Sequence, residues 1–514
     1  MCSSDLNRRG VIYTIGLSFV RAGEIWAGTD DGLIQLTLDE GKTWENVTPP
    51  ELTPWSKVTH IEASHFDAGT AYAAVDRHRV EDYQAYLYRT RDFGKTWQRV
   101  SNGIPEGSFL NCVREDPVRK ELLYACTEKG VYASFNDGAV WQPLQLNLPV
   151  TSVRDLVVHE NDLVIATFGR SFWILDDVTP LRQIDSHVAA ADTWLFHPQT
   201  AIRMRPGSDQ GTPVPMDEPL APNPPEGAVL DYCLKDRASS AIQLEIFDSE
   251  GKLVRRFASD DVLHKTNPND VPIQMEWVRD PKPLLAEAGM HRFVWDLRYA
   301  LPKSVRSSFW GPAGQLAVPG NYIVKLTANG KSSTQPLTIK LDPRVKTPQD
   351  VLTRQFGLAS RLAARLGEVS LALQQVGDLR KQVEARKKDA TDSAELQKAL
   401  RGLEEKVEAA VEPDSDADFG LFGLAAPGKE HEPLPKVAAA LTGLLIIVDS
   451  SDMGPAADAA MASGRWEEAA QETLSRWKAF QKDDLAIVNA LLEKAKLKML
   501  VISPVIHGDV PAAR

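Results

Sequence analysis

Alternation of apolar and polar residues is the dominant pattern of the first two hundred positions. Short runs rich in β-branched and aromatic side chains are separated by turns that contain Gly, Asn or Asp, which is typical of β-strands. The runs fall into four groups of four, within residues 11–47, 58–100, 110–143 and 153–196, and the last run of the fourth group is Thr193–Phe196. A four-stranded propeller blade needs roughly 40–50 residues. The pattern therefore predicts a partial β-propeller of about four blades over residues 7–198.

A turn motif, called here the Asp box, repeats in the first three groups. Its pattern is Ser/Thr-x-Asp-x-Gly-x-x-Trp, over residues 37–44, 90–97 and 134–141, with Asn136 replacing the aspartate in the third copy. We expect the glycine to take a positive φ, the Asp or Asn side chain to accept backbone N–H groups within the turn, and the tryptophan to cover the apolar layer of its blade. The residues predicted in this structural, non-catalytic role are Asp39, Gly41, Trp44, Asp92, Gly94, Trp97, Asn136, Gly138 and Trp141.

The second group contains an extra polar stretch, residues 76–84, between two of its strands. A long charged loop between strands is where a propeller carries specificity, although a solvated loop with surface ion pairs gives the same pattern. Arginines near strand ends in the later groups are further candidates. The candidate ligand-binding residues are Asp76, Arg77, His78, Arg79, Asp82, Tyr83, Arg114 and Arg170.

Composition changes twice after the fourth group. Residues 199–227 are rich in Pro, Gly and Asp and predict a linker, while residues 228–345 return to strand-like runs and predict an Ig-like or fibronectin-like β-sandwich. At Thr347, the predicted cap of a first helix, the apolar period becomes helical. Residues 346–503 therefore predict a helical bundle and residues 504–514 a tail. A coiled-coil arm for self-association is the alternative, and the fold class is multidomain, mainly β and then α.

Charge and cysteine content narrow the function classes. The formal net charge is −12 and the pI about 5.4, which argues against a nucleic-acid partner. No apolar run is long enough to span a bilayer; the longest candidate, 437–448, reads as a buried helix. The four cysteines form no CxxC pair, and His60, His65 and His78 match no metal-ligand spacing. The sequence predicts no metal site, no cofactor and no disulfide.

Three stretches resemble a bacterial family. They are residues 26–33 (Trp-Ala-Gly-Thr-Asp-Asp-Gly-Leu), the Asp boxes, and residues 166–177, in which Phe168 stands where the family usually has His. The family comprises BNR/Asp-box proteins known as "glycosyl hydrolase" or sortilin (VPS10) N-terminal-like proteins, and residues 311–345 and the helical tail are similar to its C-terminal half.

This resemblance implies that the boxes lie at the propeller periphery, away from the central cleft. It also implies that more blades precede those seen here and that the protein is secreted or periplasmic. Residues 1–6 resemble a translated sequencing adapter, so the true N-terminus is expected to be missing.

Two functions from different classes remain. The first is a sortilin-like binding propeller that holds a peptide, protein or glycan in its cleft. The second is a glycoside hydrolase of the sialidase or xyloglucanase type, whose paired carboxylates lie roughly 5–10 Å apart; a sialidase instead needs an arginine cluster and a tyrosine nucleophile. Asp76, Asp82, Glu115 and Tyr83 supply suitable groups, but none falls in a catalytic motif. A purely structural role, with assembly through the helical tail, is a third interpretation.

Overall fold

The computed structural model describes residues 10–205, 223–263, 268–270, 275, 282–305, 312–390, 393–411, 427 and 432–503. The predicted adapter segment 1–6, most of the predicted linker (206–222), and the tail 504–514 lie outside these residues. The chain divides into two compact units, residues 1–191 and 192–514, and each is described by itself.

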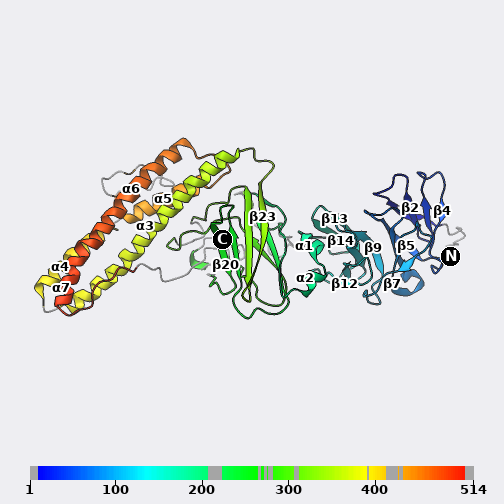
Figure 1. Cartoon of the computed structure of the whole chain (residues 1–514), viewed down its shortest axis with the longest axis horizontal. Helices are drawn as coiled ribbons and strands as arrows, with labels where there is room; N and C mark the ends of the chain where they lie inside the picture. Colours follow the sequence, from blue (N-terminus) through cyan, green and yellow to red (C-terminus); the bar gives the residue numbers. More distant parts are fainter. Residues whose placement is uncertain are drawn as a thin grey trace, which may run out of the picture. The chain divides into compact units, whose positions relative to one another are not determined.

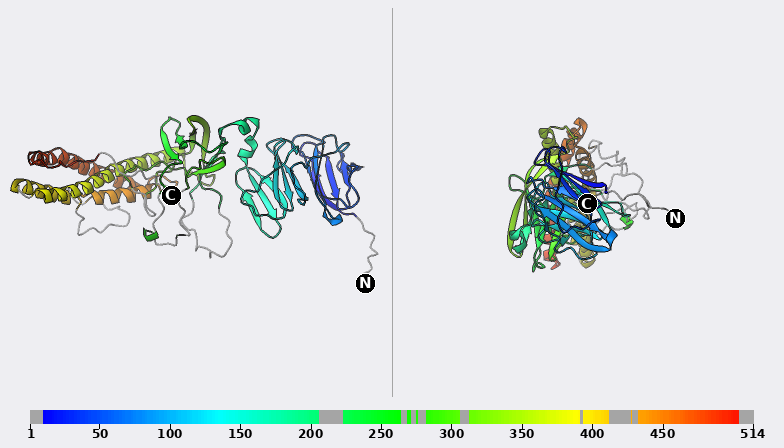
Figure 2. Two further views of the ribbon diagram at one scale, coloured as in Figure 1. Left: turned by 90° about the horizontal axis from the view of Figure 1, so that it is seen from below. Right: turned by 90° about the vertical axis from the view of Figure 1, so that its right-hand side faces the viewer.

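Unit 1 consists of consecutive antiparallel sheets, each built from strands in chain order (Figures 1 and 2). We call these sheets blades 1 to 4, and the first strand of each blade packs against the first strand of the next. This repeat of four-stranded units is the arrangement of a β-propeller, which confirms that part of the sequence prediction. The strands of blade 1 are β1 (Ile12–Leu17), β2 (Ile25–Thr29), β3 (Ile34–Thr37) and β4 (Glu45–Asn46). Those of blade 2 are β5 (Lys57–Ala63), β6 (Ala71–Arg77), β7 (Asp82–Thr90) and β8 (Gln98–Arg99). Those of blade 3 are β9 (Leu110–Glu115), β10 (Leu123–Thr127), β11 (Gly130–Ser134) and β12 (Gln142–Pro143).

Blade 4 differs from the sequence prediction because it has three strands in the described structure: β13 (Val153–His159), β14 (Asp162–Thr167) and β15 (Phe172–Leu175). The prediction of Thr193–Phe196 as its fourth strand is wrong. Residues Thr193–Leu195 form β16, which pairs with β18 (Ala228–Leu234) in unit 2. The short helices α1 (Thr179–Gln183) and α2 (Ser186–Ala190) follow β15 instead. The alternation of apolar and polar residues identifies a strand but not the strand with which it pairs. This is why the sequence-based prediction places β16 in the wrong sheet.

The Asp boxes form the hairpins between the third and fourth strands of blades 1 to 3. In each box one side-chain oxygen of the Asp or Asn accepts two hydrogen bonds, from the Ser/Thr hydroxyl that opens the motif and from a backbone N–H four residues later. For Asn136 these bonds come from the Ser134 hydroxyl (3.0 Å) and the Val140 N–H (2.9 Å). Gly41, Gly94 and Gly138 all have φ between 77° and 89°. In the third turn the neutral Asn136 side chain thus accepts the same two hydrogen bonds that Asp39 and Asp92 accept in the first two.

The box tryptophans do more than cover their own blade. The indole N–H of Trp97 donates to the Val47 carbonyl of blade 1 (2.7 Å), and that of Trp141 donates to the Val100 carbonyl of blade 2 (2.7 Å). The second and third boxes therefore dock on the end of the preceding blade. Trp44 has no such partner: it is 46% exposed and donates to Gly41 within its own turn.

Asp92→Asn is expected to keep nearly the wild-type stability, whereas Asp92→Ala is expected to lower the free energy of unfolding by about 1–2 kcal/mol, the net value of one or two hydrogen bonds. Asn136 shows that a neutral acceptor serves in this turn. The Thr96 hydroxyl and N–H hold the pKa of Asp92 below its ordinary value. The charged form thus contributes stability above about pH 4, which is lost as the pH falls through the lowered pKa. The measurement is denaturant unfolding of the three proteins between pH 2 and pH 7.

The asparagine variant is the control for charge, since it keeps the turn bonds but cannot titrate. Equal losses in Asp92→Asn and Asp92→Ala would show that the negative charge, rather than the acceptor geometry, stabilises the turn.

Unit 2 begins with two sheets that enclose one apolar core, to which Leu230, Leu244, Trp295 and Val324 contribute. The smaller sheet has the order β16-β18-β21 and the larger one β17-β23-β22-β19-β20. The strands not yet given are β17 (Ala201–Arg203), β19 (Gln243–Phe247), β20 (Leu253–Ala258), β21 (Gly289–Trp295), β22 (Gly320–Ala328) and β23 (Lys331–Leu341). Strand β17 lies within the predicted linker and pairs in parallel with β23.

The C-terminal part of unit 2 is helical and shares one core (Figure 1). Its helices are α3 (Gln349–Asp389), α4 (Ala394–Ala409), α5 (Leu434–Val448), α6 (Ala457–Lys482) and α7 (Asp484–Lys494). The charged residues 380–388 form the last turns of α3, and Val383 within them is buried in the core. The prediction of Thr347 as the cap is wrong: Pro348 is the N-cap residue, and the Thr347 hydroxyl bonds to the Asp452 carbonyl. None of the described helices is both long and apolar enough to cross a membrane.

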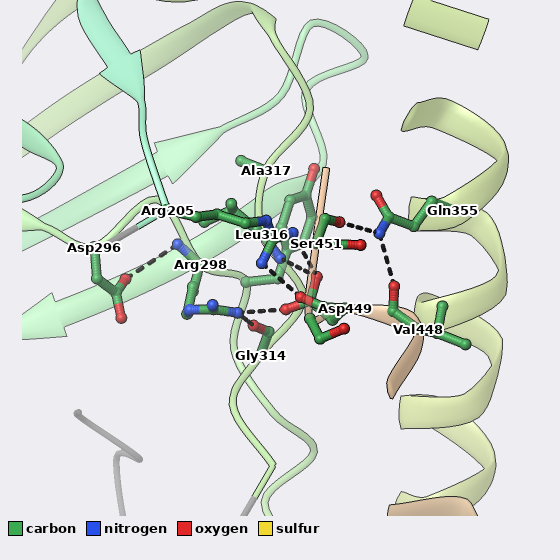
Figure 3. A network of polar contacts seen from close by, with 12 residues as sticks. Arg205, Asp296, Arg298, Gly314, Leu316, Ala317, Gln355, Val448, Asp449 and Ser451 are labelled. Atoms are coloured by element: carbon green, nitrogen blue, oxygen red, sulfur yellow. Dashed lines mark hydrogen bonds and ion pairs between the residues drawn. The ribbon is translucent and has the colours of Figure 1, made fainter. Parts of the chain in front are cut away.

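Polar contacts join the helices of unit 2 to its sheets (Figure 3). Arg205, which follows β17, donates to Asp449 and Asp452 after α5, and Arg298 donates to a carboxylate oxygen of Asp449 (2.6 Å). Gln355 of α3 donates to the backbone carbonyl of Val448 (2.7 Å). This network fixes the segment after α5 against the sheets.

Candidate functional site

Hairpins between the second and third strands of the blades lie at the end opposite the Asp boxes, since successive antiparallel hairpins alternate between the two ends of a sheet. At this end a series of contacts runs across blades 2 to 4. The His78 ring stacks on Phe109, the Glu128 N–H donates to the Phe109 carbonyl (3.1 Å), and Ser152 joins the Glu128 carboxylate to the Phe168 N–H (2.7 and 2.8 Å). We call the surface formed by His78, Tyr83, Phe109, Glu128, Arg154 and Phe168 the hairpin face.

The predicted loop of blade 2 is shorter than residues 76–84, because both strands extend into it. Strand β6 continues to Arg77 and β7 begins at Asp82, leaving a single turn at His78–Val80 and Glu81 with φ 61°. The Asp76 carboxylate accepts bonds from the backbone N–H of His78 (2.8 Å) and pairs with its Nδ1 (2.6 Å). The imidazole is thereby fixed with its ring parallel to Phe109, at 4.8 Å between centroids.

The remaining candidates of this hairpin take different roles. Asp82 accepts a hydrogen bond from the Tyr86 hydroxyl (2.7 Å) and pairs with Arg77 (3.5 Å). Burial raises the pKa of Asp82, but the bonds from Tyr86 and the Gln84 N–H outweigh this and leave the pKa lowered. Arg79 is exposed, and Tyr83 is 51% exposed with its ring 6.4 Å from that of Phe109. Tyr83 and His78 therefore present aromatic surface to solvent, while Arg77 and Asp82 hold the hairpin.

Arg114 is not part of the hairpin face. It lies four residues along β9 from Leu110, roughly 13 Å toward the Asp-box end. Its guanidinium donates to the Leu156 carbonyl, to Glu62 and to Asp155, which belong to the neighbouring blades. Burial lowers the pKa of Arg114, but the charges of Glu62 and Asp155 outweigh that effect and raise it. Arg114 thus ties three blades together.

Arg170 lies in the β14–β15 hairpin, two residues beyond Phe168. It is exposed, and its backbone carbonyl accepts the indole N–H of Trp173 (2.9 Å). Among the described residues no side-chain contact of Arg170 is recorded, so its guanidinium is available on the blade 4 side of the hairpin face.

Sequence reasoning missed a feature shared by all four blades. In each first strand one residue is bulged out of the pairing with the second strand: Tyr13, Thr59, Asn111 and Arg154. The Thr59 hydroxyl donates to the Leu110 carbonyl (3.3 Å) and the Asn111 amide to the Val153 carbonyl (2.9 Å), each in the next blade. Bulges change the direction of side chains at barrel rims and next to active sites. No sequence pattern indicates these four bulges.

In blade 4 the bulged Arg154 has no following blade among the described residues. Its guanidinium lies 5.1 Å from the Phe168 ring centroid and 3.7 Å from the Glu128 carboxylate. Phe168 is 70% exposed. The hairpin face thus carries aromatic groups at both ends, and the partly exposed ion pair of Arg154 and Glu128 lies between them.

A buried polar cluster lies toward the Asp-box end of the first strands. Burial and the charge of Arg114 lower the pKa of His60 to about 4, so its imidazole is neutral at pH 7. Burial raises the pKa of Glu115, whose carboxylate accepts bonds from the Ser64 hydroxyl and the His65 N–H. Glu62 and Glu115 are only 6% and 2% exposed. These carboxylates stabilise the junction of blades 2 and 3 and are closed to a substrate.

Among the described residues no group of three or more His, Cys, Asp or Glu side chains is placed to hold a metal ion. Cys112 and Cys126 are buried free thiols and Cys233 is half-buried; Cys2 lies outside the described part of the chain.

No protein-family model matches the chain, and no curated protein matches it. Among solved structures, the chain is similar to YCF48 from Cyanidioschyzon merolae at 17% identity, over 34% of this chain and 55% of that one, with a TM-score of 0.26. A structure of YCF48 bound to D1 peptide matches at 16% identity, over 34% of this chain and 59% of that one, with a TM-score of 0.25. A GH74 xyloglucanase from Xanthomonas campestris matches at 11% identity, over 65% of this chain and 61% of that one, with a TM-score of 0.27. The chain spans less than two thirds of each of these proteins, and the blade assignment rests on the strand order given above.

Proposed function

We propose that the blades of unit 1 bind a peptide, protein or glycan ligand on the hairpin face, in an exported bacterial protein of the sortilin-like Asp-box type. The observation that carries the proposal is the exposed row of Tyr83, Arg154 and Phe168 on a fixed strand scaffold. Aromatic rings and arginine supply most of the binding energy at protein recognition surfaces, and aromatic faces also stack on sugars. We further propose that the sheets of unit 2 form an Ig-like accessory module.

Binding is favoured over glycoside hydrolysis by the state of the carboxylates. A hydrolase needs an acid with a raised pKa beside a free second carboxylate. On the hairpin face Asp76, Asp82 and Glu128 are each engaged by neighbouring groups, and the pKa of Asp82 is lowered. Glu115 has the raised pKa of an acid but is buried.

We also propose that a further blade packs against blade 1. The register places Ile12 at the position of Val58, Leu110 and Val153, all with 0% exposure, yet Ile12 is 64% exposed. The same comparison holds for Ile15, which is 61% exposed where Ile61, Val113 and Leu156 are buried. Trp44 lacks the carbonyl that Trp97 and Trp141 find in a preceding blade. An apolar face of this kind on a blade indicates a protein contact.

Ligands that bind the intact chain on peptide and glycan arrays are expected to lose about tenfold or more in affinity with Tyr83→Ala or Phe168→Ala, because exposed aromatic anchors dominate such interfaces. Both side chains are more than half exposed, so the thermal unfolding midpoint should stay unchanged. Fluorescence anisotropy with the array hits measures the affinity.

Val118→Ala is the matched control, since Val118 is 64% exposed in the β9–β10 hairpin at the opposite end of blade 3. A ligand that responds to Val118 but not to Tyr83 or Phe168 would contradict the proposed site. Release of reducing sugar from a bound glycan, abolished by replacing one acidic residue, would favour the hydrolase instead.

A further inference from the structure

The outer edge of blade 4 lacks the strand that completes each of the other blades. In blades 1, 2 and 3 the third strand pairs with a short fourth strand, β4, β8 or β12. In the described part of the chain β15 pairs only with β14. Its position in blade 4 is that of β3, β7 and β11 in the preceding blades.

The strand register identifies the backbone N–H and carbonyl groups of β15 that would pair with a fourth strand. The carbonyls of Ile34, Leu87 and Val131 accept an N–H from the residue that follows the fourth strand, at 2.8–2.9 Å. Pairing with the second strand places Phe172 at the equivalent position. Ile174, two residues further, matches the residues that pair directly with β4, β8 and β12. Among the described residues no backbone hydrogen bond is made on this side of β15.

Within the described part of the chain, this edge also lacks the protection that exposed sheet edges carry. Natural edge strands are shielded by charged residues, proline, bulges or a covering element. Strand β15 reads Phe-Trp-Ile-Leu, without a charge or a proline, and it pairs with β14 without a bulge. Phe172 is 72% exposed and Ile174 is 59% exposed.

We propose that β15 is a docking edge for an extended peptide segment of a partner protein, which adds to blade 4 as its fourth strand. Such β-augmentation draws affinity from main-chain hydrogen bonds and specificity from alternate side chains. The site is separate from the hairpin face, and the inference does not rest on ligand binding there.

The other blades define the chemistry of the segment. Their fourth strands and the residue that follows read Glu-Asn-Val, Gln-Arg-Val and Gln-Pro-Leu. The first two residues are exposed in all three cases, while Val47 and Val100 are buried and Leu144 is partly buried. The partner segment is therefore expected to have two residues that face solvent, followed by Val or Leu, whose N–H donates to the Phe172 carbonyl.

The probe is a labelled synthetic peptide, Thr-Trp-Glu-Asn-Val-Thr, which copies residues 43–48. We expect saturable binding to the intact chain in fluorescence anisotropy. Methylation of the peptide's valine nitrogen should weaken binding about tenfold, because it removes one main-chain hydrogen bond and adds a clash. Ile174→Pro, which removes an outward N–H that an edge strand can spare, should weaken binding by a similar factor. Ile174→Ala keeps this N–H and should change binding by less than about threefold, and Tyr83→Ala should not change it.

Absence of saturable binding, or equal affinity for the plain and the N-methylated peptide, would overturn the proposal. The methylated peptide keeps this test independent of how well Ile174→Pro folds. Self-association of the chain that Ile174→Pro abolishes would assign the edge to a second copy and would equally overturn the assignment to a partner peptide.

Discussion

Asp452→Ala is expected to lower the free energy of unfolding of unit 2 by about 3–5 kcal/mol, the cost of leaving a buried ion pair without one partner. Asp452 accepts bonds from Arg203 (2.6 Å) and Arg205 (2.8 Å). The Arg203 side chain is 2% exposed and that of Asp452 6%. Burial lowers the pKa of Arg203, against the opposing effect of the Asp452 charge. Without that carboxylate a guanidinium stays buried with the Ala317 carbonyl as its remaining partner among the described residues.

Two further variants of this ion pair are expected to lose less stability than Asp452→Ala. Arg203→Ala should cost less than Asp452→Ala, because Asp452 keeps its bond from Arg205. Asp452→Asn should also cost less, since an amide oxygen still accepts while the charge is lost. All the described helices longer than five residues lie in unit 2, so circular dichroism at 222 nm during denaturation follows this unit selectively.

Glu384→Ala is the matched control within the same unit. Glu384 pairs with Lys388 on α3, with side chains 67% and 75% exposed, and an exposed helical pair of this kind contributes about 0.5 kcal/mol or less. If Asp452→Ala cost no more than Glu384→Ala, the bonds from Arg203 and Arg205 to Asp452 would have no role in holding the helices to the sheets.

The repeat in unit 1 could be predicted from sequence because its signal is local. The Gly position and the Asp or Asn acceptor act within one turn, and the three glycines have a positive φ. The same holds for α5 (Leu434–Val448), which contains the apolar run 437–448 and ends with it. Local propensity and apolar period determine such elements.

Several differences between the sequence prediction and the structure concern the partner of a strand or side chain. Strand β16 was recognised as a strand, but its partner β18 lies beyond the linker, and no local pattern encodes that pairing. Arg114 is a ligand-binding candidate in the sequence, but in the structure its guanidinium donates hydrogen bonds to residues of the two neighbouring blades. Phe109 and Arg154 join the hairpin face through a ring stack and a bulge, neither of which leaves a trace in sequence. The sequence therefore indicates the hairpin of residues 76–83 as a candidate, but it does not indicate Phe109 and Arg154, which lie on the same face.

Asp137→Ala is expected to lower the free energy of unfolding of unit 1 by about 3 kcal/mol, because it removes the buried acceptor of Tyr72 and Arg89, two largely buried donors at the junction of blades 2 and 3. The Asp137 carboxylate accepts bonds from the Tyr72 hydroxyl (2.5 Å), from Arg89 (2.7 Å) and from Arg91. Asp137 is 6% exposed and Tyr72 is 2% exposed. Burial raises the pKa of Tyr72, and the bond to Asp137 adds to the effect. Tryptophan fluorescence during denaturation, with Trp141 in the same Asp box, measures the loss.

Glu40→Ala isolates the contribution of the junction, because Glu40 occupies the same position in the first Asp box. Both residues follow the box Asp or Asn with a positive φ, 62° for Glu40 and 57° for Asp137, so the backbone cost of alanine in this left-handed conformation is similar in the two variants. Glu40 is exposed, and its side chain makes no hydrogen bond or ion pair with any described residue. The difference between the two losses is the energy that Asp137 contributes between blades. Equal losses would show that the turn, rather than the contact with Tyr72 and Arg89, determines the effect, and that the box docks on the preceding blade through its tryptophan alone.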